Sequence, residues 1–175
     1  MINNNENDMI NESEDDLIYI YIAGPMFKEA EINQRRLEAK KLDDVLQDSN
    51  RGYYICNPVD LPFDEFNGLS SRVIFSTDYY NINDANVFFF ELASEDSGTM
   101  VEFGNVIEKY MQGNPMHIYP VFYDLRLSRN DVAGIECPIG FNSYLVGALD
   151  YNRINTYSSF DEALLQFKKD FNLGD

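Results

Sequence analysis

The chain has 175 residues, enough for one domain with a substantial hydrophobic core. Its 30 acidic and 13 basic residues give a formal net charge of −17. Nucleic acid is therefore excluded as an expected partner, because phosphate binding requires a basic face. Residues 1–16 contain six acids and no base, and the remaining 24 acids and 13 bases still leave −11. This balance also weighs against a substrate with several phosphates and favours a neutral ligand.

Residues 1–16 are polar, charged and without periodicity, which predicts a disordered acidic tail before a single domain over residues 17–175. The tail is the reverse of a basic signal-peptide start, and the apolar run 17–23 is too short to cross a bilayer. We therefore expect a soluble, cytoplasmic protein without a membrane partner.

The small number of cysteine and histidine residues argues against several kinds of chemistry. Cys56 and Cys137 are the only cysteines and His117 is the only histidine. A disulfide scaffold, a zinc site and a His-assisted nucleophile all lack support, and Cys56 is expected to be a reduced core thiol. We expect neither a metal nor a cofactor.

Apolar runs and helical periodicities alternate along the chain. Strands are predicted over residues 17–22, 53–56, 87–92, 116–123 and 153–157. Helices are predicted over residues 28–47, 72–83, 142–150, after the turn at residues 94–99, and after a capping box at residues 159–162. This alternation predicts an α/β fold: one open, mainly parallel five-stranded sheet of flavodoxin or Rossmann type, with helices on both faces.

Ligands of such sheets bind beyond the carboxyl ends of the strands. The segments that follow four of the predicted strands are rich in Gly, Pro, Asp and Asn, which are out of place in a core. They are residues 23–27, 57–60, 94–99 and 124–126. The Gly24-Pro25 turn matches neither the dinucleotide fingerprint nor the P-loop, so no dinucleotide or nucleoside triphosphate is expected.

The turn at residues 94–99 carries the best candidates for chemistry. Glu102 follows it in a helix, where the helix dipole and free N–H groups would stabilise the anion. An ionised carboxylate in a pocket can attack the anomeric carbon of a sugar. Asp78 and Asp96 are candidate helpers, and Gly98 would let ligand and backbone approach closely. From spacing alone, a surface Glu that merely starts a helix fits Glu102 equally well.

Four segments, taken in order, resemble the nucleoside 2-deoxyribosyltransferases. They are Tyr21-Ile-Ala-Gly-Pro-Met-Phe27, Asp78, Asn86-Val-Phe-Phe, and Asp96-Ser-Gly-Thr-Met-Val-Glu102-Phe-Gly104. The resemblance extends from residue 17 to about residue 150, and the segment from Asp96 to Glu102 is its most specific part.

The resemblance implies transfer of 2-deoxyribose between nucleobases by a retaining double displacement. Glu102 would be the nucleophile at C1′, and Asp78 would assist protonation of the leaving base. Asp96 would hold the deoxyribose hydroxyls, while Tyr21 would orient Glu102. Phe27 would pack on the base, and Gly24 in the turn after the first strand would bind substrate.

The resemblance further implies that Asn142 reaches the 5′-hydroxyl of a substrate bound by a neighbouring subunit, so a homodimer or higher homo-oligomer is expected. Asn86 departs from the family pattern, where many members have Asp, and this change is expected to affect loop geometry more than catalysis.

Two alternatives remain open at this point. One is a 2′-deoxynucleoside 5′-monophosphate N-glycosidase on the same fold, which would use water as the acceptor. The other is a nucleoside- or nucleotide-sensing module without turnover. Asp96 argues against the first because it would repel a phosphate, and the joint presence of Glu102, Asp96 and Asp78 argues against the second.

Overall fold

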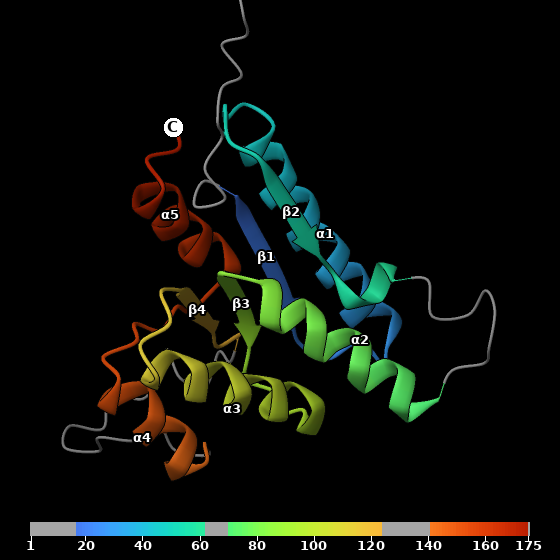
Figure 1. Cartoon of the computed structure of the whole chain (residues 1–175). Coiled ribbons are helices and arrows are strands. Elements are labelled where there is room, and N and C mark those ends of the chain that lie inside the picture. The colour runs from blue at the N-terminus through green and yellow to red at the C-terminus, as the bar shows by residue number, and fades with distance from the viewer. Residues whose placement is uncertain (1–16, 62–69, 124–140, 175) are drawn as a thin grey trace, which may run out of the picture.

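The computed structural model describes residues 17–61, 70–123 and 141–174 (Figure 1). The acidic tail, the segment 124–126 and Cys137 lie outside these residues. In chain order the elements are β1 (Ile18–Ala23), α1 (Glu29–Leu46), β2 (Tyr53–Cys56), η2 (Pro58–Asp60), α2 (Ser71–Asp84), β3 (Val87–Glu91), α3 (Ser97–Met111), β4 (His117–Val121), α4 (Ser143–Tyr151) and α5 (Phe160–Asp170). The predicted elements agree with these bounds to within a few residues at their ends, except for the last strand.

The described strands form one parallel sheet in the order β2-β1-β3-β4. The α/β architecture expected from the alternating pattern is thus confirmed. The predicted fifth strand is reduced to a single parallel bridge between Tyr157 and Val121. The reason lies just upstream, where the backbone N–H groups of Arg153 and Ile154 close the end of α4, and Arg153 adopts a positive φ of 55°. The chain aligns with the sheet edge only at Tyr157.

Helices cover both faces of the sheet, and side chains of alternating direction fill two hydrophobic layers. On one face, Tyr21, Phe88 and Phe90 pack with buried residues of α2, α3 and α4. On the other, Ile20 and Phe89 pack with buried residues of α1 and α5. Full burial of one such aromatic or aliphatic side chain stabilises a fold by about 1.5–3 kcal/mol, so these two layers fix the sheet and the helices that deliver the site.

Asn86 joins the two central strands at the amino end of β3. Its side-chain oxygen accepts from the backbone N–H of Tyr19 at 3.0 Å, and its side-chain nitrogen donates to the carbonyl of Leu17 at 2.8 Å. An ionised Asp cannot make the second of these bonds. The Asn at this position therefore has a geometric role in the chain, at the opposite edge of the sheet from the predicted site.

Helix caps fix where α2, α3 and α5 begin. Ser70, Asp96 and Ser159 each accept a backbone N–H from the first turn of the helix that follows. The capping box predicted for α5 forms only in part, because Glu162 bonds to Ser158 and not to the capping residue. Within the ranges that the structure describes, no helix is long and apolar enough to cross a membrane.

Candidate functional site

Tyr21 and Glu102 meet on the face of the sheet that is covered by α2, α3 and α4. Tyr21 lies in β1 and is fully buried, and its hydroxyl donates a hydrogen bond to Oε1 of Glu102 at 2.8 Å. Glu102 projects from α3, which begins after the turn at the end of β3. A strand that is buried on both faces thus holds the donor, and a capped helix holds the acceptor, so both are fixed by regular structure.

Glu102 is a partly buried carboxyl whose pKa is raised from 4.5 to about 7. Burial is the main cause; the hydrogen bond from Tyr21 lowers the pKa, and the carboxylates of Asp78 and Asp96 raise it. The sequence suggested that the helix dipole would stabilise the anion. The net shift is in the other direction. Glu102 lies in the second turn of α3, where the helix dipole is weak, so the effect of burial on the pKa is larger than that of the dipole.

Asp78 comes to the same place from α2. It is buried, and its Oδ1 has no hydrogen-bond partner in the described part of the chain. Burial raises its pKa from 3.8 to about 6, and the Tyr21 hydroxyl lowers it in part. Its burial excludes the simple interpretation of a solvated residue on the exposed face of α2. An unpaired, buried carboxyl oxygen is costly for folding and is therefore a sign of a ligand site.

The two carboxyl groups titrate at neighbouring pH values. With pKa values of about 6 and about 7, Asp78 and Glu102 together hold about one proton between those two pH values. The higher pKa places most of this proton on Glu102. The form with Glu102 ionised and Asp78 protonated, which could supply a nucleophile and an acid at the same time, is therefore the less populated of the two singly protonated forms. Chemistry that needs both would start from this form.

Asp96 and Gly98 shape the turn before α3. Oδ2 of Asp96 caps the helix by accepting from the backbone N–H and the hydroxyl of Thr99, at 2.9 and 3.0 Å. A Cβ on Gly98 would lie 3.2 Å from this same oxygen, so glycine leaves room for the cap. The sugar-binding role expected for Asp96 and the ligand contact expected for Gly98 stay predictions. In the structure, Asp96 caps the helix that carries Glu102, and Gly98 leaves room for this cap.

The turn after β1 contains Gly24 and Phe27. A Cβ on Gly24 would lie 1.6 Å from Nη1 of Arg35, on the face of the sheet opposite to Glu102. An added Cβ would displace this guanidinium, so glycine allows it to pack here. Phe27 is 80% exposed, so its ring is not part of the core and is available to a ligand. Contacts of both residues with a substrate stay predictions.

Asn142 caps α4, and its side-chain oxygen accepts from the backbone N–H of Tyr144 at 2.9 Å. The backbone N–H of Asn142 donates to Oε1 of Glu95 at 2.9 Å, which ties the start of α4 to the acidic turn. Asn142 and Glu95 line a cavity of about 850 Å³ between α3 and α4. The structure brings Tyr21, Asp78 and Glu102 together, with Asp96 close enough to raise the pKa of Glu102, while no bond joins Asn142 directly to these residues among those described.

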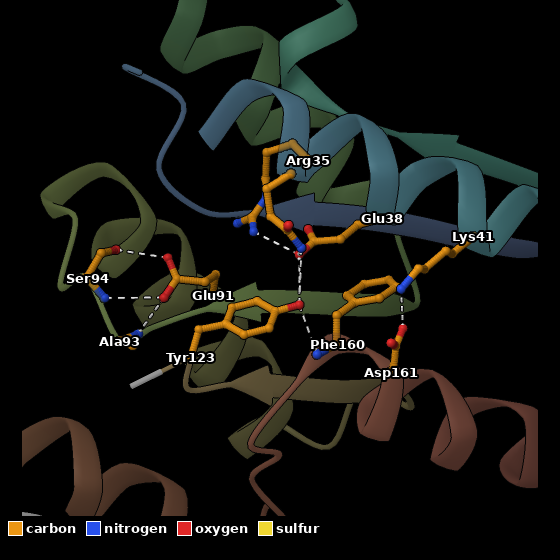
Figure 2. A network of polar contacts seen from close by, with 10 residues as sticks. Arg35, Glu38, Lys41, Glu91, Ala93, Ser94, Tyr123, Phe160 and Asp161 are labelled. Carbon is orange, nitrogen blue, oxygen red and sulfur yellow. Dashed lines mark hydrogen bonds and ion pairs between the residues drawn. The ribbon is translucent and has the colours of Figure 1, made fainter. Parts of the chain in front are cut away.

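Sequence reasoning missed Glu91 and the residues around it. Glu91 ends the central strand, is buried, and accepts from the backbone N–H groups of Ala93 and Ser94 at 2.9 and 3.3 Å and from the Ser94 hydroxyl at 3.1 Å (Figure 2). It therefore shapes the turn that leads to Asp96. The available signal was a single charge at the end of an otherwise apolar strand.

Cys56 ends β2 beside the site and is a free, buried thiol, as expected. Burial, together with the carboxylates of Asp78 and Glu102, raises its pKa to about 12. A neutral thiol of this kind is a packing group and a poor nucleophile. In the portion of the chain described by the structure, no group of three or more His, Cys, Asp and Glu side chains could hold a metal ion.

Comparison with known proteins gives distant likenesses. No model of a known protein family matches the chain. The uncharacterized protein UU063 of Ureaplasma parvum serovar 3 is 28% identical over 123 residues, which cover 66% of this chain and 77% of UU063. A conserved protein from Enterococcus faecalis V583, known from a crystal structure, is similar with a TM-score of 0.57 and 19% identity, over 86% of this chain and 99% of that one. That likeness shows the shared fold alone.

A further solved structure is the 2-deoxyribosyltransferase of the psychrotolerant bacterium Bacillus psychrosaccharolyticus. It is similar with a TM-score of 0.38 and 26% identity, over 58% of this chain and 71% of that chain. A score this low carries no argument about this chain, so the function has to be argued from the site.

Proposed function

We propose that the protein is a nucleoside 2-deoxyribosyltransferase, an enzyme that transfers 2-deoxyribose from one nucleobase to another. The observation that carries the proposal is the meeting of Glu102 and Asp78 at the Tyr21 hydroxyl, two carboxyls with raised pKa values that share about one proton near neutral pH. The segments that resemble this family are the ones that deliver these three side chains.

In the proposed first half-reaction, an ionised Glu102 oxygen attacks C1′ of a 2′-deoxynucleoside. A C1′–O bond forms, the N-glycosidic bond breaks, and the proton on Asp78 passes to the leaving base. The Tyr21 hydroxyl orients the attacking carboxylate and stabilises its anionic form.

In the second half-reaction, another base attacks C1′ of the ester from the face that the first base left. The C1′–O bond to Glu102 breaks, and Asp78 accepts the proton that the incoming nitrogen loses. Two inversions give net retention, and the enzyme returns to its starting protonation state. No metal or cofactor takes part in this scheme.

The charges at the site favour a neutral nucleoside over its 5′-monophosphate. The charged groups that shift the pKa of Glu102 among the described residues are Asp78 and Asp96, and both are acidic. A dianionic phosphate placed among them would be repelled. This supports transfer over the phosphate-dependent hydrolysis that the same fold could host.

The direct test incubates the protein with a 2′-deoxynucleoside, or with its 5′-monophosphate, each with and without a different free base, and separates the products by chromatography. We expect a new deoxynucleoside from the first substrate and only in the presence of the base. Faster turnover of the monophosphate, with free base and sugar phosphate as the products, would replace the transferase with the N-glycosidase. Binding of a nucleoside without any product over hours would replace it with a sensing module.

We also propose that the working unit is a homo-oligomer in which Asn142 serves the neighbouring subunit. Tyr144 and Tyr151 of α4 and Met111 of α3 are 88%, 78% and 55% exposed. They lie on helices that line the apolar cavity next to Asn142, so a second copy would cover them. The test mixes inactive Glu102→Ala and Asn142→Ala proteins after subunit exchange. Recovery of part of the activity is expected, and mixtures no more active than the separate variants would contradict sharing.

A further inference from the structure

A second polar cluster lies on the other face of the sheet, between α1, the end of β4 and the start of α5 (Figure 2). Nη2 of Arg35 donates to Oε1 of Glu38 at 2.8 Å, and these two side chains are only 4% and 3% exposed. The same oxygen of Glu38 accepts from Gln34 at 2.9 Å and from the Tyr123 hydroxyl at 3.3 Å, and that hydroxyl accepts from the backbone N–H of Phe160 at 2.9 Å. We call Arg35, Glu38 and Tyr123 the supporting cluster.

The supporting cluster reaches the predicted site through Gly24. Besides the 1.6 Å approach to Nη1, a Cβ on Gly24 would lie 2.8 Å from Cζ of Arg35 and 3.0 Å from Cβ of Glu91. The guanidinium is therefore packed directly against the backbone that follows β1. Tyr21, three residues earlier and within β1, holds Glu102 on the opposite face.

Glu91 connects the contact between Arg35 and Gly24 to the turn that precedes α3. Ala23 pairs with Phe90 in the parallel register, which places Gly24 beside Glu91 at the carboxyl edge of the two central strands. Glu91 in turn holds the backbone of Ala93 and Ser94. The backbone at Gly24 thus lies against both the guanidinium of Arg35 and the side chain of Glu91, which shapes the turn before α3.

The charge of this region argues for support and against a second ligand site. The guanidinium is already paired with the carboxyl group of Glu38, so its positive charge is balanced and it offers little attraction to an anion. Nε and Nη1 of Arg35 make no hydrogen bond to any described residue, although the side chain is buried. Unlike Asp78, Arg35 is already paired with a carboxyl group and its Nη1 is packed against the backbone of Gly24. Its unpaired donors are therefore a cost of the packing and do not mark a second ligand site.

We propose that Arg35 is a positioning residue that fixes the turn at Gly24 and, through the side of Glu91, the turn at Ser94, so that substrate is held in line with Glu102. This inference rests on the proposed function for its kinetic consequence and on the contact geometry for its structural one. Loss of Arg35 lets the two turns move relative to Glu102, and misplacement of reacting atoms by a fraction of an ångström lowers kcat with little effect on KM.

The main test replaces the buried pair by apolar residues, Arg35→Met with Glu38→Leu, because exchange of a whole buried ion pair is often neutral for stability. A second variant, Arg35→Lys, keeps the charge but not the flat guanidinium over Gly24. Arg36→Lys is the control: Arg36 neighbours Arg35 on α1, and its guanidinium pairs with Asp60 at 3.0 Å with both side chains exposed. Circular dichroism and melting check each fold, and Arg35→Lys carries the test if the double variant does not fold.

Two readouts are needed: kcat and KM for base exchange, and hydrogen–deuterium exchange of peptides that contain Gly24 and Ser94. For both variants at Arg35 we expect kcat to fall about tenfold with KM changed by less than about threefold, and faster exchange in the two turns. The control is expected to match the wild type in both readouts. Wild-type kcat, or unchanged exchange in the turns, would overturn the positioning role. If the wild-type protein transfers no base, the proposed function fails, and the exchange of the two turns alone decides the role of Arg35.

Discussion

The two faces of the sheet carry buried carboxyl groups in opposite electrostatic settings. On the face of α2 and α3, Asp78 is buried and Glu102 partly buried, with no cation among the groups that shift their pKa values, and Oδ1 of Asp78 has no partner in the described chain. On the face of α1 and α5, burial also raises the pKa of Glu38, but Arg35, Gln34 and Tyr123 counteract that rise. A buried carboxyl group without a neighbouring cation indicates a site of chemistry, whereas one bound by a cation and several hydrogen-bond donors indicates a structural role.

The largest expected effect separates Glu102 from Glu38. Glu102→Gln keeps the size of the side chain but removes the nucleophile, and we expect base exchange to fall by about a thousandfold or more. Glu38→Gln leaves the nucleophile in place and weakens the partner of a buried guanidinium, so its main effect is a lower melting temperature. Initial rates and thermal melts of both variants measure this. Comparable activity in the two proteins would remove the distinction between the faces.

The next effect concerns the hydroxyl that holds the nucleophile. Tyr21→Phe removes the donor to Glu102, and a hydrogen bond to a charged group is worth about 1.5–3 kcal/mol, so kcat/KM is expected to fall about 10- to 100-fold. Tyr119→Phe is the matched control, because the Tyr119 hydroxyl is also buried and donates to a carboxylate, Asp170, at 2.8 Å, on the α5 side of the sheet. Equal losses in both variants would show that the effect of Tyr21 is one of packing.

A smaller effect is expected from pH. The reaction needs Glu102 ionised and Asp78 protonated, which is the minor of the two singly protonated forms, because Glu102 has the higher pKa. Both forms are most populated between the pKa values of about 6 and about 7, where the pair holds about one proton. The dependence of kcat/KM on pH should therefore be bell-shaped with its maximum in that interval, and activity should fall on both sides. The profile of Asp78→Asn should lose its alkaline limb. A wild-type rate that is flat from pH 5 to pH 8 would contradict the shared proton.

The last expected effect is one of stability and does not involve the rate. The pKa of Glu102 is raised from 4.5 to about 7 on folding. Its protonated form therefore contributes stability that is fully present below about pH 4.5 and is lost as the pH rises through about 7. Gln cannot ionise, so Glu102→Gln should be more stable than the wild type at pH 8, by about 3 kcal/mol at most, and nearly equal to it at pH 4.5. Denaturant unfolding at the two pH values measures this difference. If the wild type is more stable than Glu102→Gln at pH 8, the raised pKa of Glu102 is contradicted.

The sequence predicted the elements well and named three side chains that the structure brings together, Tyr21, Asp78 and Glu102, for identifiable reasons. The continuous apolar runs around Tyr21 and Phe89 are typical of buried parallel strands, and the acidic turn before Glu102 is placed by the helix period of Phe103 and Ile107. The predicted strand over residues 153–157 failed because the end of α4 uses that backbone, which is a tertiary effect.

The pKa of Glu102 and the supporting cluster could not be predicted in the same way. The dipole argument considered only the helix that carries Glu102, while the pKa is set mainly by burial under neighbouring elements. Arg35 and Glu38 look like an ordinary exposed i,i+3 pair in the sequence. Their burial depends on the absence of a side chain at Gly24, a residue that sequence reasoning assigned to the ligand.

The central claim is that Glu102 forms a covalent bond to the sugar, and intact-mass measurement of the protein mixed with a 2′-deoxynucleoside tests it most directly. Without an acceptor base, we predict a fraction of the protein heavier by one deoxyribosyl group. Peptide mapping should place this group on Glu102, and addition of a free base should discharge it with formation of the new nucleoside. A protein that exchanges bases with no such adduct, or with the adduct on another residue, would contradict the account.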